Sequence, residues 1–220
     1  VHIGGVWRPD RASWVRTAVT RRLGNRSRPA HTKSVTHFLL GTAPVLACEP
    51  VPEFVNVPNG LLDWTAGTLH PHNPEVLSTV QLPVRWEPRA ECPIIEAWLA
   101  EVLPADLLGP TADRSGFIWE VIGYLCFSGN PLHKAILLLG SGRNGKGTFL
   151  RLVTALLGEE NVSNVDLHSL VNNRFRAAEL FGKVANIAGD LDGAWLESTA
   201  LFKAITGGDA IQAERKYGAP

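Results

Sequence analysis

One stretch constrains the fold of this chain more than any other: AILLLGSGRNGKGTFLRLV, from Ala135 to Val153. The segment Lys134 to Leu139 is a short apolar run, which is typical of a buried parallel strand. After a loop rich in glycine, the segment from Lys146 onward has apolar residues at helical spacing and ends at Gly158, a residue that favours helix C-termini. The sequence therefore predicts a strand, a loop and a helix in an α/β fold.

The loop has the spacing of a phosphate-binding loop. Gly140 is followed after four residues by Gly145 and Lys146, so that backbone N–H groups and a helix N-terminus can surround an anion. We expect Lys146 to hold the β- and γ-phosphates of a nucleotide, although an ordinary tight turn is the alternative. The pattern has Ser or Thr directly after the lysine, whereas Gly147 stands there, so Thr148 is the candidate Mg²⁺ ligand. The predicted nucleotide-binding residues are Gly140, Ser141, Gly142, Arg143, Asn144, Gly145, Lys146, Gly147 and Thr148.

A phosphate loop also predicts a second strand that ends in acidic residues. The run KVANIAGDLD supplies one, because Val184 to Ala188 are mostly apolar and Asp190 and Asp192 follow. Side chains alternate along an extended chain, so the two carboxylates point the same way, which suits Mg²⁺ coordination and water activation. We therefore predict Asp190 as a metal ligand and Asp190 and Asp192, with Lys146, as catalytic residues. A solvated turn is the alternative for the acidic pair.

Two basic segments are candidate contacts for a nucleic acid. Residues 1–40 carry eight Lys/Arg and one acidic residue, with Trp7 and Trp14 as stacking surfaces. Near the other end, a helix from about Trp195 to Ile205 is expected to precede a strand and turn that carry Arg215 and Lys216. Either segment could instead be a solvated face with solubilising charges.

The rest of the chain predicts a soluble, mostly helical protein with small strands. Helical spacing covers residues 11–23, 34–43, 93–103 and 115–129, whereas residues 50–93 combine an Asn-Gly turn with short β-branched runs and prolines. Hydrophobic residues make up 45% of the chain, but no window approaches the length of a membrane span, so we expect a cytoplasmic protein. The three cysteines, Cys48, Cys92 and Cys126, are too far apart for metal-ligand spacing and are expected to be buried thiols.

Four ordered motifs across residues 55–220 resemble the phage and plasmid primase-helicases, which contain a superfamily 3 helicase. The motifs begin at Asn59, Gly140, Asn173 and Leu201 and read NGLLDWTAGTLHPH, GSGRNGKGTFL, NRFRAAELFGKVANIAGDLD and LFKAITGGDAIQAERKYGAP. The resemblance implies an ATP- and Mg²⁺-dependent DNA helicase of the bacterial host cytoplasm, with an AAA+-like P-loop NTPase core that forms a hexameric ring on single-stranded DNA. It places Lys203 and Lys216, with Thr206 to Asp209, in the segment that contains the DNA-contacting hairpin.

The resemblance also implies a domain organisation. We predict a basic helical arm at residues 1–49, a helical companion domain at 50–130 and the ATPase core at 131–220. The family's sensor motif and arginine finger are expected beyond Pro220, which leaves the core incomplete at its C-terminus and the isolated fragment a poor ATPase. A primase domain upstream is a further possibility in this family. A non-catalytic module for DNA binding or assembly is one alternative function, and a nucleoside-phosphate kinase, which also uses a GKGT loop, is another.

Overall fold

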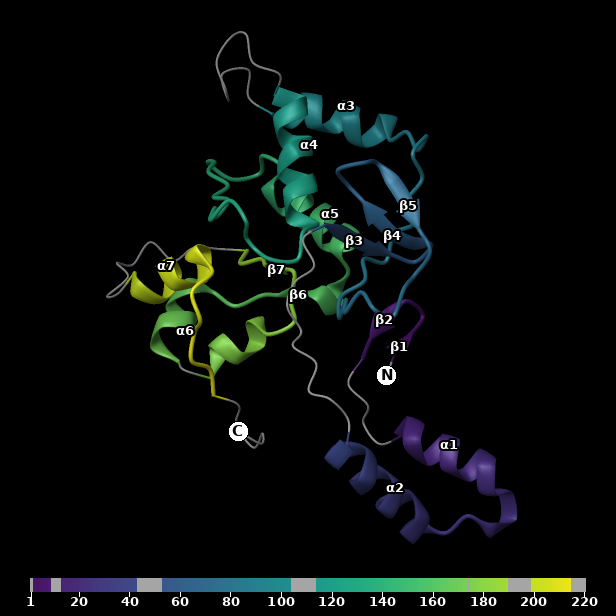
Figure 1. Cartoon of the computed structure of the whole chain (residues 1–220). Coiled ribbons are helices and arrows are strands. Elements are labelled where there is room, and N and C mark those ends of the chain that lie inside the picture. The colour runs from purple at the N-terminus through teal and green to yellow at the C-terminus, as the bar shows by residue number, and fades with distance from the viewer. Residues whose placement is uncertain are drawn as a thin grey trace.

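The computed structural model describes residues 2–8, 13–42, 53–103, 114–173, 175–189 and 199–214. These residues form a mixed α/β structure that is mostly helical, with three small sheets (Figure 1). The helices are α1 Ser13–Leu23, α2 Pro29–Thr42, α3 Pro93–Val102, α4 Arg114–Leu125, α5 Lys146–Leu157, α6 Leu167–Asn172 and α7 Ala200–Gly207, with 3-10 turns η1 Gly24–Arg26, η2 Glu159–Asn161 and η3 Arg176–Leu180. The strands are β1 His2–Ile3, β2 Val6–Trp7, β3 Phe54–Val57, β4 Gly60–Asp63, β5 Thr68–His70, β6 Val162–Ser163 and β7 Ala185–Asn186.

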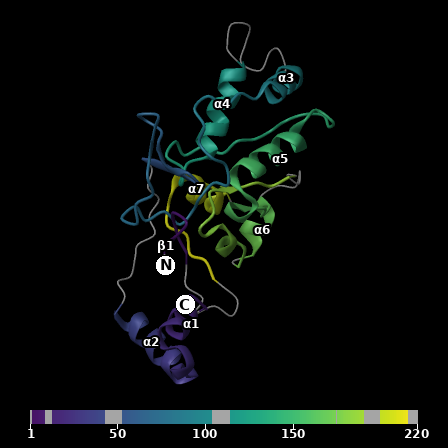
Figure 2. The ribbon, with the colours of Figure 1, turned by 90° about the vertical axis from the view of Figure 1, so that its right-hand side faces the viewer.

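The first two helices form an antiparallel pair joined by η1. Val15 and Val19 are the buried residues of α1, and they lie one turn apart on the side that packs against α2. Figures 1 and 2 both show this pair apart from the other described elements. The sequence predicted both helices. Helix α2 begins at Pro29, five residues before the expected start, because proline is well accommodated in the first turn of a helix.

An antiparallel three-stranded sheet follows, with the order β3-β4-β5. Val57 pairs with Gly60 across the tight connection, and Leu62 pairs with both Val55 and Leu69. The N-terminal β1-β2 hairpin is attached beside this sheet, since the buried Asn56 side chain donates a hydrogen bond to the Gly5 carbonyl at 2.8 Å. The predicted small strands and turns between residues 50 and 93 are thus confirmed.

One hydrophobic core joins the sheet to the helices that follow. Its buried residues are Val55, Val57, Leu62, Leu82, Leu99, Ile118, Ile122, Phe149, Val153, Leu157 and Val162. Helix α5 contributes Phe149, Val153 and Leu157, which recur every four residues and form one buried stripe. Helix α5 is terminated by Gly158, which follows its last residue and has a φ of 89°, as the sequence predicted.

The strand predicted from Lys134 to Leu139 is wrong. The segment has no strand assignment in the structure, and Leu137 and Leu139 are 59% and 81% exposed, while Leu138 alone packs against the core. A buried parallel strand requires backbone partners in a sheet, and no described strand pairs with these residues. The P-loop core expected around this strand is therefore not formed by the described residues.

The second predicted strand does form, at smaller size. β7 pairs in parallel with β6, with Val162 opposite Ala185 and Ser163 opposite Asn186. Two flanking bonds extend the ladder, from the N–H of Val184 to Asn161 and from the N–H of Ile187 to Ser163, both at 2.8 Å. Helix α6 and η3 lie between the two strands in sequence, as a parallel connection requires.

Toward the C-terminus, α7 matches the described part of the helix expected from Trp195 to Ile205. The strand expected after it is not formed by residues 209–214. Gly208, which has a φ of 77°, terminates α7, and the N–H of Asp209 then donates a hydrogen bond to the Ala204 carbonyl.

Candidate functional site

The loop from Gly140 to Gly145 leads directly into α5. Residues 141–144 are exposed, and Gly145 precedes the first helical residue with a φ of 87°, a value that glycine adopts without strain. The N–H of Phe149 donates the first helical hydrogen bond to the Gly145 carbonyl at 2.9 Å. Lys146 is therefore the first residue of a twelve-residue helix, as the sequence predicted.

The ammonium group of Lys146 folds back over the loop. Its Nζ donates to the Gly140 carbonyl oxygen at 3.0 Å and to Asn144 Oδ1 at 2.8 Å. An ammonium group has three N–H donors, so one remains for a further acceptor. A Cβ at Gly140 would lie 1.8 Å from Asn144 Nδ2 and 2.9 Å from Lys146 Nζ, so this arrangement requires glycine at position 140.

The same loop also carries backbone N–H groups that are available to a ligand. No backbone N–H of residues 141–147 donates a hydrogen bond to another described residue. The first N–H groups of any helix lack a partner within the helix, and the aligned peptide dipoles make that end positive. The loop and the start of α5 can therefore accept an anion such as a phosphate.

Thr148, the candidate metal ligand, lies exposed in the first turn of α5. Its Oγ1 accepts a hydrogen bond from Arg151 Nη2 at 3.0 Å. A hydroxyl oxygen has two lone pairs, so one remains for another contact.

Helix α3 supports the loop from behind, which the sequence did not reveal. A Cβ at Gly145 would lie 3.1 Å from Val102 Cγ1 and 3.2 Å from Trp98 Cζ2, so these two side chains touch the loop where α5 begins. No local pattern signals this contact, because more than forty residues separate the partners in the sequence.

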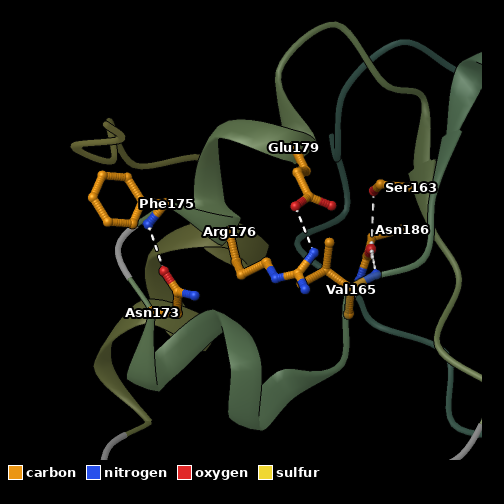
Figure 3. Close-up of polar contacts among 7 residues, drawn as sticks. All are labelled: Ser163, Val165, Asn173, Phe175, Arg176, Glu179 and Asn186. Atoms are coloured by element: carbon orange, nitrogen blue, oxygen red, sulfur yellow. Dashed lines mark hydrogen bonds and ion pairs between the residues drawn. The ribbon is translucent and has the colours of Figure 1, made fainter. Parts of the chain in front are cut away.

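Polar contacts join the start of the region between β6 and β7 to β7 itself (Figure 3). Asn186 Oδ1 accepts bonds from Ser163 Oγ and from the N–H of Val165, both at 2.9 Å, and its Nδ2 donates to the Val165 carbonyl at 2.8 Å. Arg176 and Glu179 form an exposed ion pair at 2.6 Å, as Figure 3 shows. The side chain of Asn186 thus fixes the chain just before the acidic run.

Helix α6, which lies within this region, begins after Asp166. The Oδ1 atom of Asp166 accepts a hydrogen bond from the N–H of Ser169 at 2.7 Å, which caps the helix. The hydrogen bonds from Ser169 hold the pKa of the Asp166 carboxyl below its usual range, because they stabilise the charged form.

Several predicted site residues lie outside the described residues, namely Asp190, Asp192, Arg215 and Lys216. Lys203 is described and lies exposed on α7. The end of α7 is tied to the segment before the loop, since Asn130 Nδ2 donates to the Thr206 carbonyl at 3.1 Å. Among the described residues no cluster of His, Cys, Asp or Glu could by itself hold a metal ion.

Comparison with protein families assigns most of the chain. Residues 4–104 match the family described as "D5 N terminal like", and residues 138–220 match "Family of unknown function (DUF5906)". The first match contains α1 to α3, and the second contains α5 and the candidate phosphate loop. None of the helices in the described ranges is long and apolar enough to cross a membrane. The chain therefore joins the D5 N-terminal-like domain of phage and plasmid primase-helicases to a DUF5906 domain, a combination typical of proteins associated with superfamily 3 helicases.

Proposed function

We propose that this chain is the nucleotide-binding part of an ATP-dependent DNA helicase of superfamily 3, acting in phage or plasmid replication. The observation that carries the proposal is the position of Lys146, at the first residue of α5 with its ammonium group over a loop of free N–H donors. Such a loop recognises a polyphosphate by charge and by backbone hydrogen bonds.

The residues would divide the work as follows. Lys146 would exchange its bond to Asn144 for one to a phosphate oxygen of ATP, while the loop N–H groups hold the other phosphate oxygens. A Mg²⁺ ion would neutralise charge on these phosphates, and the hydroxyl of Thr148 and the carboxylate of Asp190 are the oxygen ligands that it prefers. Thr148 would bind the ion either through the lone pair that its hydroxyl oxygen still has free or after Arg151 releases its hydrogen bond to that oxygen. Asp192 would orient the attacking water.

Movement on DNA is the other half of the proposal. Lys203, Arg215 and Lys216 would contact the phosphates of single-stranded DNA, and six subunits would together form a ring around the strand. The family match at residues 4–104 supports this assignment, because that domain is found in phage and plasmid primase-helicases. The protein would then act in the cytoplasm of a bacterial host, with a primase domain as a candidate neighbour.

The test is nucleotide binding by Lys146→Ala. The loss of a charge-assisted contact to phosphate should cost about 1.5–3 kcal/mol, or roughly 10- to 150-fold in affinity. Titration with a fluorescent ATP analogue in the presence of Mg²⁺ measures it. Lys134→Ala is the control for a general loss of positive charge, because Lys134 is exposed and lies before the loop.

A second variant, which changes the two aspartates, separates nucleotide binding from nucleotide hydrolysis. Asp190→Asn combined with Asp192→Asn should keep the nucleotide affinity within a few-fold and lose turnover. Equal affinity of Lys146→Ala and the parent protein would overturn the nucleotide site. Nucleotide binding without turnover in the unchanged protein would instead favour a non-catalytic module for DNA binding or assembly.

A further inference from the structure

The hairpin formed by α1, η1 and α2 carries a separate concentration of positive charge. Residues 13–42 contain six Lys/Arg and no Asp or Glu, whereas the other 190 residues contain 15 Lys/Arg and 21 Asp/Glu. The zero net charge of the chain therefore hides two regions of opposite sign. We call residues 13–42 the basic hairpin.

Within the basic hairpin, most cations gather where the two helices are joined. The last turn of α1 contains Arg21 and Arg22, η1 contains Arg26, and Arg28 and Lys33 follow. All five side chains are exposed, and no described acidic side chain pairs with them. Arg28 donates to the carbonyls of Asn25 and Ser27, which fixes its position and leaves its charge uncompensated.

Helix stability alone explains only part of this pattern. Cations in the last turn of a helix interact favourably with its dipole, which accounts for Arg21 and Arg22. The same effect gives no advantage to Lys33, which lies in the second turn of α2. The absence of any acidic residue over 30 positions also exposes the hairpin to self-repulsion that a polyanion would relieve.

An aromatic side chain accompanies the cations. Trp14 is 50% exposed, and Arg21 follows it by seven residues, which is two helical turns. Both side chains therefore lie on the same side of α1, about 10 Å apart along the helix axis. An exposed indole on the same side of the helix as a guanidinium group suits the unpaired bases and phosphates of a single strand, whereas a duplex keeps its bases stacked inside.

We propose that the basic hairpin is a binding surface for single-stranded DNA, distinct from the phosphate loop and from Lys203 and Lys216. Arg21, Arg26 and their neighbours contact the phosphates, and Trp14 stacks on a base. The choice of DNA over RNA rests on the proposed function, while the surface itself does not require ATP. The hairpin then holds the strand in every nucleotide state, outside the ATPase core.

The test measures binding of the whole chain to a fluorescein-labelled oligo-dT of about 20 nucleotides by anisotropy, without nucleotide. Arg21→Gln combined with Arg26→Gln removes about two phosphate contacts, so the log–log salt slope should fall in magnitude by about 1.4. The same counterion release predicts roughly 50-fold weaker binding at about 50 mM salt. Arg85→Gln combined with Arg89→Gln removes the same charge from another exposed segment and should change the affinity less than about two-fold.

The aromatic contact is tested separately. Trp14→Ala should weaken binding by about 5- to 150-fold, the range of one base–aromatic stack, whereas Trp14→Phe should restore most of it. The proposal would be overturned if the Arg21/Arg26 and Arg85/Arg89 double variants lost affinity for the oligomer equally, or if neither lost affinity. Tighter binding of duplex DNA than of the oligomer, or hairpin-dependent binding to vesicles of anionic lipid without binding to DNA, would also overturn it. Because Lys146→Ala is scored by ATP affinity, failure of the hairpin site leaves the nucleotide site untouched, and the reverse also holds.

Discussion

At the scale of single residues, the candidate site depends on a glycine with no room for a side chain. Gly140 lies under the side chains of Asn144 and Lys146, and both hydrogen bonds of the Lys146 ammonium group depend on this close approach. The atoms that a methyl group would displace are the ends of flexible side chains, so they can move aside at little cost to the fold. The effect of a methyl group should therefore fall on function rather than on stability.

We predict that Gly140→Ala lowers ATP affinity by about ten-fold or more, because it turns Lys146 away from the loop, while the melting temperature changes by only a few degrees. Titration with an ATP analogue and thermal unfolding measure the two effects. Gly123→Ala is the control: it lies in α4 with open space around it, so the helix should gain about 0.5–1 kcal/mol and nucleotide binding should not change. A Gly140→Ala protein with the parent's affinity would show that Lys146 does not depend on the loop geometry.

At the scale of elements, the sequence predicted helices better than strands. The stripe of Phe149, Val153 and Leu157 is a local signal, because one helix can bury it without knowledge of the rest of the chain. The run Lys134 to Leu139 has the composition of a strand, but its state depends on partners that no local pattern specifies. The same limit applies to β7, which was predicted at the right place although its pairing with β6 could not be foreseen.

A half-buried thiol just after α4, that of Cys126, gives a prediction about pH. Burial raises the pKa of the Cys126 thiol to about 11, and its Sγ donates a hydrogen bond to the Ile122 carbonyl. In the unfolded chain this thiol ionises near its ordinary pKa of about 8.5–9. As the pH rises, the unfolded state therefore loses the thiol proton first, and this loss favours unfolding. The contribution is therefore fully present below about pH 8.5 and is lost as the pH rises toward 11.

Between pH 8 and about 10.5, the free energy of unfolding of the parent protein should fall by roughly 2 kcal/mol more than that of Cys126→Ala. Urea unfolding at several pH values measures the difference. Cys126→Ala also loses packing, which lowers its free energy of unfolding by the same amount at every pH. This constant loss does not matter, because only the change of the free energy of unfolding with pH is compared. Parallel pH profiles for the two proteins would mean that the thiol ionises equally in both states.

At the scale of the whole molecule, the two family segments meet at the candidate site. α3 lies in the segment matched at residues 4–104 and the loop in the segment matched at 138–220, and Trp98 and Val102 of α3 touch Gly145. The sequence predicted the loop and the helix after it, but not this support, because packing between distant elements leaves no periodic signal. The roles of Asp190, Asp192 and Lys216, and the three-part division of the chain, stay predictions that rest on the residues and the resemblance.

Because of this contact, we predict that nucleotide binding changes the fluorescence of Trp98 in α3. We expect a phosphate that draws Lys146 away from Asn144 to shift the loop at Gly145, and the indole of Trp98 lies against that residue. ATP should therefore change the tryptophan emission of the parent protein, and Trp98→Phe should remove most of the change while the protein still binds ATP. Trp64→Phe is the control, because Trp64 packs against Phe127, with ring centroids 4.8 Å apart, and does not line the loop. An emission change that survives in Trp98→Phe and disappears in Trp64→Phe would place the coupling on the other side of the molecule.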